Sequence, residues 1–475
     1  MTDLATRPAS VAPALPTGFA CAGCGYVAPM DALPLRCPNA QPTDDIDHVL
    51  RRTLDTGRVA WPTGGEANPF VRYRTLWHGY QRALAAGRSD AEIVAEIEAL
   101  DRAVAAVDGR GFSITPLVEA DGVLVKDETD NVSGSHKARH LFGTLLELRL
   151  LGAGADDPQR PLAIASCGNA ALAAAVVARA AGRELLVFVP TDADPQVLSR
   201  LAELEARITI CERRAGETGD PTVLRMREAL AAGALPFTCQ GNENGLAIEG
   251  GLTLGYELAD QLREGGRHVD HLFVQVGGGA LASSVIQALA EAHALGAIDA
   301  LPRIYAVQTS NTHPLSRAYE LVLERLNLRL GAHLDRASRP LRAVVADGRA
   351  DEDLAWAARH RSDFMWPWET TPHSIASGIL DDETYDWLAV VRGMLVSGGR
   401  PVLVDESTLA QANQIARTTG IDVDPTGSAG LAGLLELRRH AGLDAKEKCA
   451  VLFTGVRRNE GHPPNEGHPL DGGSQ

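Results

Sequence analysis

The sequence has little of what marks several large classes of protein. Aromatic residues make up 5% of its 475 residues, and Lys and Arg (45) are outnumbered by Asp and Glu (61), so the formal net charge is −16. Because this charge disfavours polyanions, we expect no nucleic acid and no membrane surface as a partner. No apolar run reaches the roughly 18 residues that a membrane-spanning helix needs. The N-terminus lacks the basic start and apolar core of a secretory signal, and seven cysteines are few for a disulfide scaffold of this length. These absences predict a soluble, cytoplasmic protein.

The remaining composition is that of an ordinary globular protein, and 475 residues can form two or three domains. From about residue 111, short apolar runs alternate with Ala- and Leu-rich stretches at helical spacing. The runs predict strands at 123–125, 162–165, 185–189, 208–211, 272–276, 304–307 and 451–454. The stretches predict helices at 137–151, 169–181, 195–205, 222–232, 248–264 and 280–295, and residues 80–108 also show helical spacing. Apolar strands separated by helices indicate an α/β fold of parallel sheets covered on both faces.

The chain is predicted to divide into five parts. Residues 1–50 form an N-terminal tail, loose over 1–20, and a small Cys-containing extension, and residues 51–110 form a helical lead-in. Residues 111–140 and 246–455 form a large domain, and 141–245 form a small one. Residues 456–475 are rich in Pro, Gly and Asn, a composition that predicts a disordered tail.

The first segment with candidate functional residues is Ser133-Gly134-Ser135-His136-Lys137-Ala138-Arg139. Lys137 stands at a predicted boundary between a loop and a helix. Such a boundary holds the lysine amine at a defined point, beside the free N–H groups of the helix start. An ordinary surface lysine at a helix start is the alternative, and this string alone does not separate the two.

Two later loops each join a predicted strand to a predicted helix. Ser166-Cys167-Gly168-Asn169-Ala170 suits the binding of an anion by N–H groups at a helix N-terminus. Cys167 within it is expected to be a small packing residue rather than a nucleophile. In Gly277-Gly278-Gly279-Ala280-Leu281, consecutive glycines let backbone N–H groups approach a phosphate. No lysine follows as in a P-loop, and the G-x-G-x-x-G spacing of dinucleotide-binding folds is missing.

The fourth segment is Asp424-Pro425-Thr426-Gly427-Ser428-Ala429. In this order, the four segments resemble those of pyridoxal-phosphate (PLP) enzymes of fold type II, the tryptophan synthase β superfamily. The likeness covers about residues 110–440 and is strongest to threonine synthase-like and serine/threonine dehydratase-like members. It implies two open parallel sheets flanked by helices, with PLP held between the domains.

The resemblance also implies roles for individual residues. Lys137 would hold PLP as a Schiff base and act as the general base in catalysis. Asn169 would bond the ring oxygen, the loop Gly277, Gly278, Gly279, Ala280 and Leu281 would bind the phosphate, and Thr426 would face the pyridine nitrogen, with Ser428 as its alternative. The substrate would bind at Ser135, Ser166, Cys167, Gly168 and Ala170. The large domain would then bind PLP, and the small domain would carry the substrate loop.

The activity implied is elimination or replacement at the β or γ carbon of a small amino acid, as in threonine synthases. The alternative is a serine/threonine-type ammonia-lyase that gives a 2-oxo acid and ammonia, and a PLP-binding protein without turnover is a third possibility. His136 and Ala170 depart from the usual patterns and leave the subfamily open. A threonine synthase needs basic groups for a substrate phosphate, for which Lys126, Arg139 and Arg72 are candidates. The family also implies a homodimer.

A cysteine motif precedes these segments. Cys21-x-x-Cys24 and Cys37 match three positions of the Cys-x-x-Cys…Cys-x-x-Cys zinc ribbon with which some threonine synthases begin. Ala40 occupies the fourth position, and His48 is an untypical eleven residues beyond Cys37. From the sequence we favour a degenerate ribbon that folds without metal, with a Cys₃His zinc site as the alternative.

Overall fold

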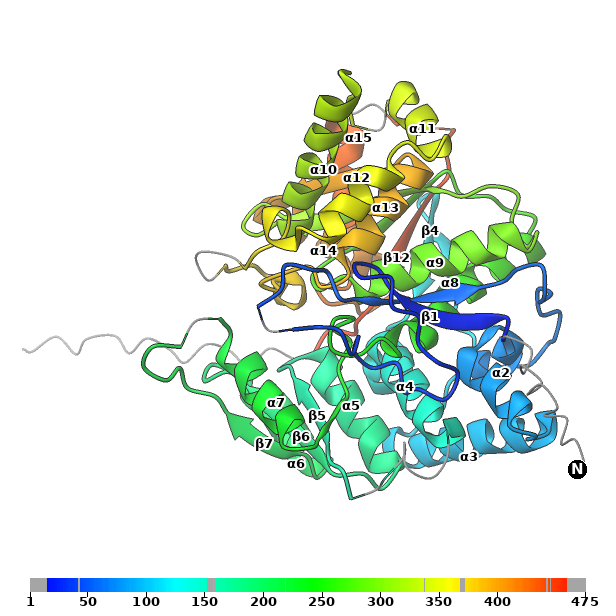
Figure 1. Cartoon of the computed structure of the whole chain (residues 1–475), viewed down its shortest axis with the longest axis vertical. Helices are drawn as coiled ribbons and strands as arrows, with labels where there is room; N and C mark the ends of the chain where they lie inside the picture. Colours follow the sequence, from blue (N-terminus) through cyan, green and yellow to red (C-terminus); the bar gives the residue numbers. More distant parts are fainter. Residues whose placement is uncertain are drawn as a thin grey trace, which may run out of the picture.

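The computed structural model describes residues 15–41, 43–151, 157, 159–217, 219–336, 338–367, 372–440, 443–444 and 446–458. Two lobes, each built around a sheet, lie one above the other in Figure 1, and an N-terminal hairpin crosses between them. None of the helices in this described part of the chain has the length and apolar character that crossing a lipid bilayer requires.

The larger sheet has six strands in the order β11-β10-β9-β12-β4-β3. All neighbours in it are parallel except the edge strand β3, which is antiparallel to β4. The bounds are β3 Leu117–Ala120, β4 Val123–Asp127, β9 His271–Gln275, β10 Arg303–Thr309, β11 Arg400–Val404 and β12 Cys449–Phe453. Every residue of β9 and β12 is buried, as expected for central strands with both faces covered.

The smaller sheet is parallel throughout, in the order β7-β6-β5-β8. Its strands are β5 Leu162–Ala165, β6 Leu185–Val189, β7 Arg207–Ile210 and β8 Leu235–Pro236. The first two match the predicted bounds, and the predicted strand 208–211 begins one residue earlier in the structure. The four strands lie within 141–245, and the six strands of the larger sheet lie within 111–140 and 246–455.

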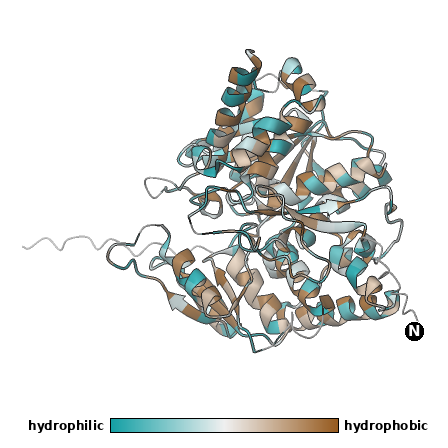
Figure 2. Cartoon of the chain, viewed as in Figure 1, coloured by the Kyte–Doolittle hydropathy of each residue, from teal (hydrophilic) through white to brown (hydrophobic). Residues whose placement is uncertain are grey.

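Helices cover both sheets. The lower lobe of Figure 1 carries α2 His78–Ala85, α3 Asp90–Asp108, α4 Lys137–Leu151, α5 Asn169–Ala180, α6 Pro195–Glu203 and α7 Pro221–Ala231. The upper lobe carries α8 Ala247–Glu264, α9 Ala280–Ala294, α10 Pro314–Leu330, α11 Arg339–Ala346, α12 Asp351–Ala358, α13 Trp387–Ser397, α14 Glu406–Thr418 and α15 Ala429–His440. In Figure 2 the outer helices alternate between brown and teal along their turns, so one side packs inward and the other meets solvent.

The predicted α/β fold of parallel sheets is confirmed, and six predicted helices agree with the structure within two residues at each end. Three expectations are corrected. The helical spacing of apolar residues over 80–108 belongs to two helices, α2 and α3. The first ends before Gly87, which takes a positive φ, and Ser89 caps the start of the second. The predicted loose tail over 1–20 overlaps β1 Thr17–Cys21, in which Phe19 is buried. The predicted disorder over 456–475 is wrong for its first residues, because the backbone N–H groups of Val456 and Arg457 donate to the carbonyls of Gly134 and Asp422; residues 459–475 lie outside the described part of the chain.

Candidate active site

Lys137 is the first residue of α4 and lies close to the carboxyl ends of β4 and β12. Two contacts fix this position: Ser135 bridges to Gly455, and the backbone N–H of His136 donates to the carbonyl of Thr454 at 3.1 Å. Ser133, just before, has a φ of 57°, so the backbone turns sharply into the helix. The carboxyl ends of parallel strands are the usual place for a binding site in an α/β fold.

The chain contains four lysines, and their locations single out Lys137. The Lys126 amine is fully buried and paired with Glu257 at 2.6 Å. Lys446 and Lys448 are exposed just before β12, at the opposite end of the strand. Lys137 is half-buried, and its charge acts on three groups from two other segments: Cys239, and the neighbouring Asp381 and Asp386.

The glycine loop joins β9 to α9, as predicted. Gly279 has a φ of 98° and stands before the first residue of α9, and Gly278 donates its N–H to Asp381 Oδ2 at 2.8 Å. A Cβ on Gly277 would meet the same carboxylate and would lie 2.9 Å from the Cα of Ile379. The loop therefore binds a carboxylate oxygen through the Gly278 N–H, in line with the anion binding for which the sequence singled it out.

Asp381 and Asp386 come from the segment that wraps this loop, and the sequence analysis missed both. Burial raises the pKa of Asp381 to about 6, although the positive charge of Lys137 opposes the shift. Burial and the nearby Asp47 raise the pKa of Asp386 to about 7. Thr384 fastens the segment to the loop by donating its hydroxyl to the Gly277 carbonyl at 2.8 Å. The acidic stretch over 381–386 was the signal available in the sequence.

Asn169 lies at the start of α5, beyond the carboxyl end of β5. Its Oδ1 accepts from Arg458 Nη2 at 3.0 Å, and the same Arg458 nitrogen donates to the Ser133 carbonyl at 2.7 Å. A Cβ on Gly455 would lie 2.7 Å from Asn169 Nδ2. The substrate-loop segment and the Lys137 segment, about 30 residues apart in the sequence, thus meet at Arg458, which the sequence analysis assigned to the tail.

Cys167 is half-buried in the same loop. Burial raises the pKa of its thiol, and the charges of Asp192 and Asp220 raise it further. A thiol that keeps its proton is a poor nucleophile, so this finding favours the packing role expected for Cys167.

Three hydroxyls compete for a place beside the cofactor. Thr426 Oγ1 accepts from the N–H of Gly378 at 3.0 Å, and Ser428 is fully buried and donates to the Asp424 carbonyl at 3.0 Å. The hydroxyl of Thr454, which the sequence analysis did not consider, accepts from Gln275 Nε2 at 2.6 Å, and the backbone carbonyl of Thr454 accepts from the His136 N–H. Of the three residues, Thr454 contacts the Lys137 segment directly, through this carbonyl.

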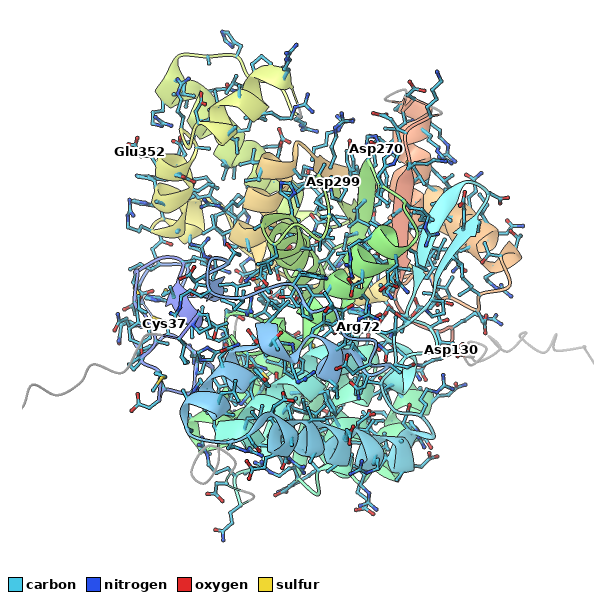
Figure 3. All side chains as sticks on the ribbon, turned by 90° about the vertical axis from the view of Figure 1, so that its right-hand side faces the viewer. Cys37, Arg72, Asp130, Asp270, Asp299 and Glu352 are labelled. Atoms are coloured by element: carbon cyan, nitrogen blue, oxygen red, sulfur yellow. The ribbon has the colours of Figure 1, made fainter. Side chains whose placement is uncertain are left out.

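The basic residues proposed for a substrate phosphate are engaged elsewhere. Lys126 and Arg139 are fully buried, and Glu257 accepts from both at 2.6 Å. Arg72 pairs with Asp260 and Glu264 and lies where the lead-in helices meet the upper lobe (Figure 3). All three are therefore structural residues, and the expectation that they bind a phosphate is wrong.

These residues fit the cofactor that the sequence resemblance implied. Three groups would hold PLP. The half-buried amine of Lys137 would hold its aldehyde, the N–H groups of the glycine loop its phosphate, and the side-chain amide of Asn169 its ring oxygen. Buried polar atoms beside Lys137 also lack partners among the described residues: Ser133 Oγ, Ser135 Oγ and His136 Nε2. Such atoms are expected where a polar ligand binds.

Comparison with known proteins agrees with this geometry. The pattern of the family described as pyridoxal-phosphate dependent enzyme matches residues 110–455. Threonine synthase of Methanocaldococcus jannaschii is 23% identical over 334 residues, which cover 70% of this chain and 69% of the relative. Threonine synthase of Mycobacterium tuberculosis strain H37Rv is 25% identical over 331 residues, covering 68% and 75%.

Solved structures share the fold. The processed form of threonine deaminase isoform 2 from Solanum lycopersicum superimposes with a TM-score of 0.52 at 15% identity, covering 78% of this chain and 91% of that one. Diaminopropionate ammonia lyase of Escherichia coli gives a TM-score of 0.53 at 16% identity, covering 77% and 88%. The family match spans most of the chain and includes all four predicted segments. The chain belongs to the family of pyridoxal-phosphate dependent enzymes, whose members use PLP.

Proposed function

We propose that this enzyme catalyses elimination or replacement at the β or γ carbon of a small amino acid, in the manner of a threonine synthase. Two links around Lys137 carry the proposal: its charge acts on Asp381, which accepts from the Gly278 N–H, and Arg458 joins Ser133 of the Lys137 segment to Asn169. The curated relatives named above support the threonine synthase-like version. A homodimer in the cytoplasm, with PLP bound by 111–140 and 246–455 and the substrate loop in 141–245, completes the proposal.

Each residue around Lys137 has a role in this proposal. Lys137 would hold the cofactor and would then take the proton from the substrate α carbon, since its half-buried amine is the base at this position. When bound, PLP supplies an electron sink for the charge left on that carbon. Gly277, Gly278 and Gly279 hold the phosphate with their N–H groups, and Asn169 orients the ring. Burial keeps the pKa of His136 well below its usual range, so this neighbour stays neutral and leaves proton transfer to Lys137.

The substrate carboxylate binds at the N–H groups of the Ser166–Ala170 loop. Ser135 contributes its hydroxyl, which is buried and without a partner among the described residues. Thr426 or Thr454 would face the pyridine nitrogen, and a hydroxyl there would leave this nitrogen uncharged, which would favour elimination and replacement over transamination.

An ammonia-lyase is the second candidate, and one observation favours it. Lys126, Arg139 and Arg72 are paired with carboxylates, so none of them is available to a phosphorylated substrate. Arg458, beside Asn169, already donates to Asn169 Oδ1 and to the Ser133 carbonyl. A lyase acting on an unphosphorylated amino acid needs no such cation.

Titration of the purified holoenzyme with L-serine, L-threonine and O-phospho-L-homoserine distinguishes these reactions. We expect the cofactor absorption to change with one of them, with release of phosphate for replacement, or of ammonia and a 2-oxo acid for the lyase. Lys137→Ala should abolish turnover, whereas Lys446→Ala, at an exposed lysine, should not. A cofactor spectrum that no amino acid perturbs would contradict the proposal and favour a PLP-binding protein without turnover.

A further inference from the structure

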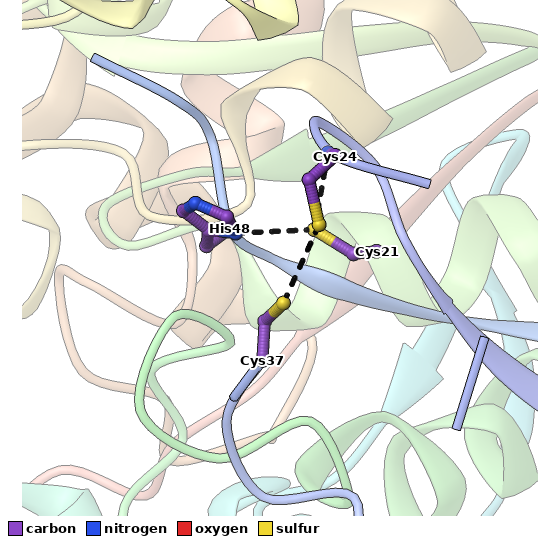
Figure 4. A group of neighbouring side chains, drawn as sticks. All are labelled: Cys21, Cys24, Cys37 and His48. Carbon is purple, nitrogen blue, oxygen red and sulfur yellow. Dashed lines mark hydrogen bonds between the residues drawn. The ribbon is translucent and has the colours of Figure 1, made fainter. Parts of the chain in front are cut away.

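Four potential metal ligands converge in the N-terminal extension, away from the active site. They are the thiols of Cys21, Cys24 and Cys37 and the imidazole of His48, and their ligand atoms all lie within 4.8 Å of one another (Figure 4). Cys24 Sγ is 3.6 Å from Cys37 Sγ, and Cys21 Sγ is 3.5 Å from His48 Nδ1. We propose that these four residues, here called the Cys₃His cluster, bind one zinc ion as a structural site.

The fold explains how His48 joins the cysteines despite its untypical spacing. β1 ends at Cys21 and pairs with β2 Leu50–Leu54, and the register places Cys21 opposite Leu50. His48 therefore stands two residues before the partner of Cys21, at the same end of the hairpin. The sequence shows only that His48 follows Cys37 by eleven residues, and it does not show that strand pairing brings His48 close to Cys21.

Tight turns present the three thiols. The turn after β1 closes through the N–H of Gly25, which donates to the Cys21 carbonyl, and Gly25 takes a φ of 74°. Within this turn the N–H of Cys24 points to Cys21 Sγ at 3.5 Å. A second turn returns the N–H of Ala40 to the Cys37 carbonyl. Ala40, the residue that interrupts the ribbon spacing, thus serves the turn through its backbone.

The observed separations match a tetrahedral zinc site. Zn–S bonds of about 2.3 Å and Zn–N bonds of about 2.0–2.1 Å give edges of about 3.8 Å between sulfurs and about 3.6 Å between sulfur and nitrogen. The distances of 3.6 and 3.5 Å agree with these edges. A disulfide would instead need the sulfurs at about 2.0 Å. Three thiolates and an imidazole are also a donor set that selects zinc.

Neighbouring groups orient the ligands. His48 turns Nδ1 to the cluster and places Nε2 3.0 Å from Asp44 Oδ2, and such a carboxylate commonly fixes a metal-binding imidazole. Asn39 Nδ2 points to Cys24 Sγ at 3.6 Å. With four protein ligands no coordination position is left for a substrate, so the metal is structural.

The position of the cluster indicates what the metal stabilises. Cys21 and Cys37 pack in one buried group with Phe19, Leu50 and Leu246, the residue before α8. Backbone bonds of 2.7 Å join Asp47 to Ala358 at the end of α12 and Gly245 to Leu35. A metal at the cluster would hold these connections together, so its loss should loosen the extension from both α8 and α12. The inference does not depend on the proposed activity.

Zinc content of the full-length holoenzyme, purified under reducing conditions without a metal-binding tag, tests the proposal. We expect about one zinc per chain by elemental analysis in the wild type and in the control Cys211→Ser, which changes a buried cysteine outside the cluster. His48→Ala and Cys37→Ser should lose the metal and lower the melting temperature. Cobalt reconstitution should give the visible bands of tetrahedral thiolate coordination, and His48→Ala should shift them.

Three results would overturn the proposal. The first is a wild-type protein with no zinc after reconstitution, at the background of a metal-free control protein. The second is a Cys24–Cys37 disulfide in peptides from the native protein. The third is a cobalt spectrum that His48→Ala leaves unchanged. If the variants fail to fold, the wild type is treated with a mercurial thiol reagent. We expect zinc to be released in proportion to the modification of the cluster cysteines, and modification of these cysteines without release of zinc would contradict the proposal.

Discussion

Asp381→Asn should stabilise the protein at neutral pH, because the native fold holds this carboxyl where its charged form is disfavoured. Burial raises the pKa of Asp381 from 3.8 to about 6, with Lys137 opposing the shift. The raised pKa means that the folded state binds the proton more tightly than the unfolded state does. Stability therefore falls as the pH rises from about 4 to about 6 and stays low above it.

The rise in the pKa of Asp381 sets the size of the gain in stability expected for Asp381→Asn. About two pKa units correspond to about 3 kcal/mol of unfolding free energy, since one unit is about 1.4 kcal/mol. This is an upper value, because the Asp381 side chain retains some contact with solvent. Asparagine keeps an oxygen that can accept from the Gly278 N–H, so the substitution removes the charge and preserves the bond.

Urea unfolding of the wild type and Asp381→Asn at pH 4 and pH 7.5 measures the effect. We expect a gain of about 1–3 kcal/mol at pH 7.5 and little difference at pH 4. Asp405→Asn is the matched control: Asp405 caps α14, and its bond from the Thr408 N–H lowers its pKa, so removing its charge should bring no gain at pH 7.5. An Asp381→Asn protein no more stable than the wild type at pH 7.5, or a gain equal at both pH values, would refute the reasoning.

Three further substitutions test other parts of the account. Glu257→Gln should lower the unfolding free energy measured in urea by about 3–5 kcal/mol, because it removes the carboxylate that balances the buried charges of Lys126 and Arg139. A loss below about 1 kcal/mol would count against a structural role for Glu257. Gly277→Ala should weaken PLP binding in equilibrium dialysis by about tenfold or more, about 1.4 kcal/mol, whereas Gly65→Ala, in open space, should not. Arg458→Gln removes charged bonds to Asn169 and should lower kcat/KM by about tenfold; unchanged kinetics would place Arg458 outside the site.

The sequence predicted the parts of the fold that local patterns determine. β5 and β6 were predicted with their observed bounds, because apolar runs bounded by turn residues mark buried strands. The hairpin strands β1 and β2 and the sheet strands β3, β8 and β11 were missed. β3 is an exposed edge strand with a weak apolar pattern, and β8 has only two residues. β8 also depends on pairing with β5, about 70 residues earlier in the sequence, whereas β3 pairs with the adjacent β4.

The candidate site was predictable to the same extent. The segments with Lys137, Asn169 and the three glycines lie where strand–turn–helix patterns placed them. Asp381 and Arg458 reach the site through contacts with residues more than 100 positions away, which no local pattern reveals. His48 joins the Cys₃His cluster only through the register of β1 and β2.

The assignment of Lys137 as the lysine that carries PLP is the central claim, and borohydride reduction followed by peptide mapping tests it most directly. Reduction fixes the cofactor to the lysine that holds it, and the four lysines of the chain fall at 126, 137, 446 and 448. The account predicts a phosphopyridoxyl group on Lys137 alone. A group on Lys126, Lys446 or Lys448, or no labelled lysine in a protein that contains PLP, would contradict it.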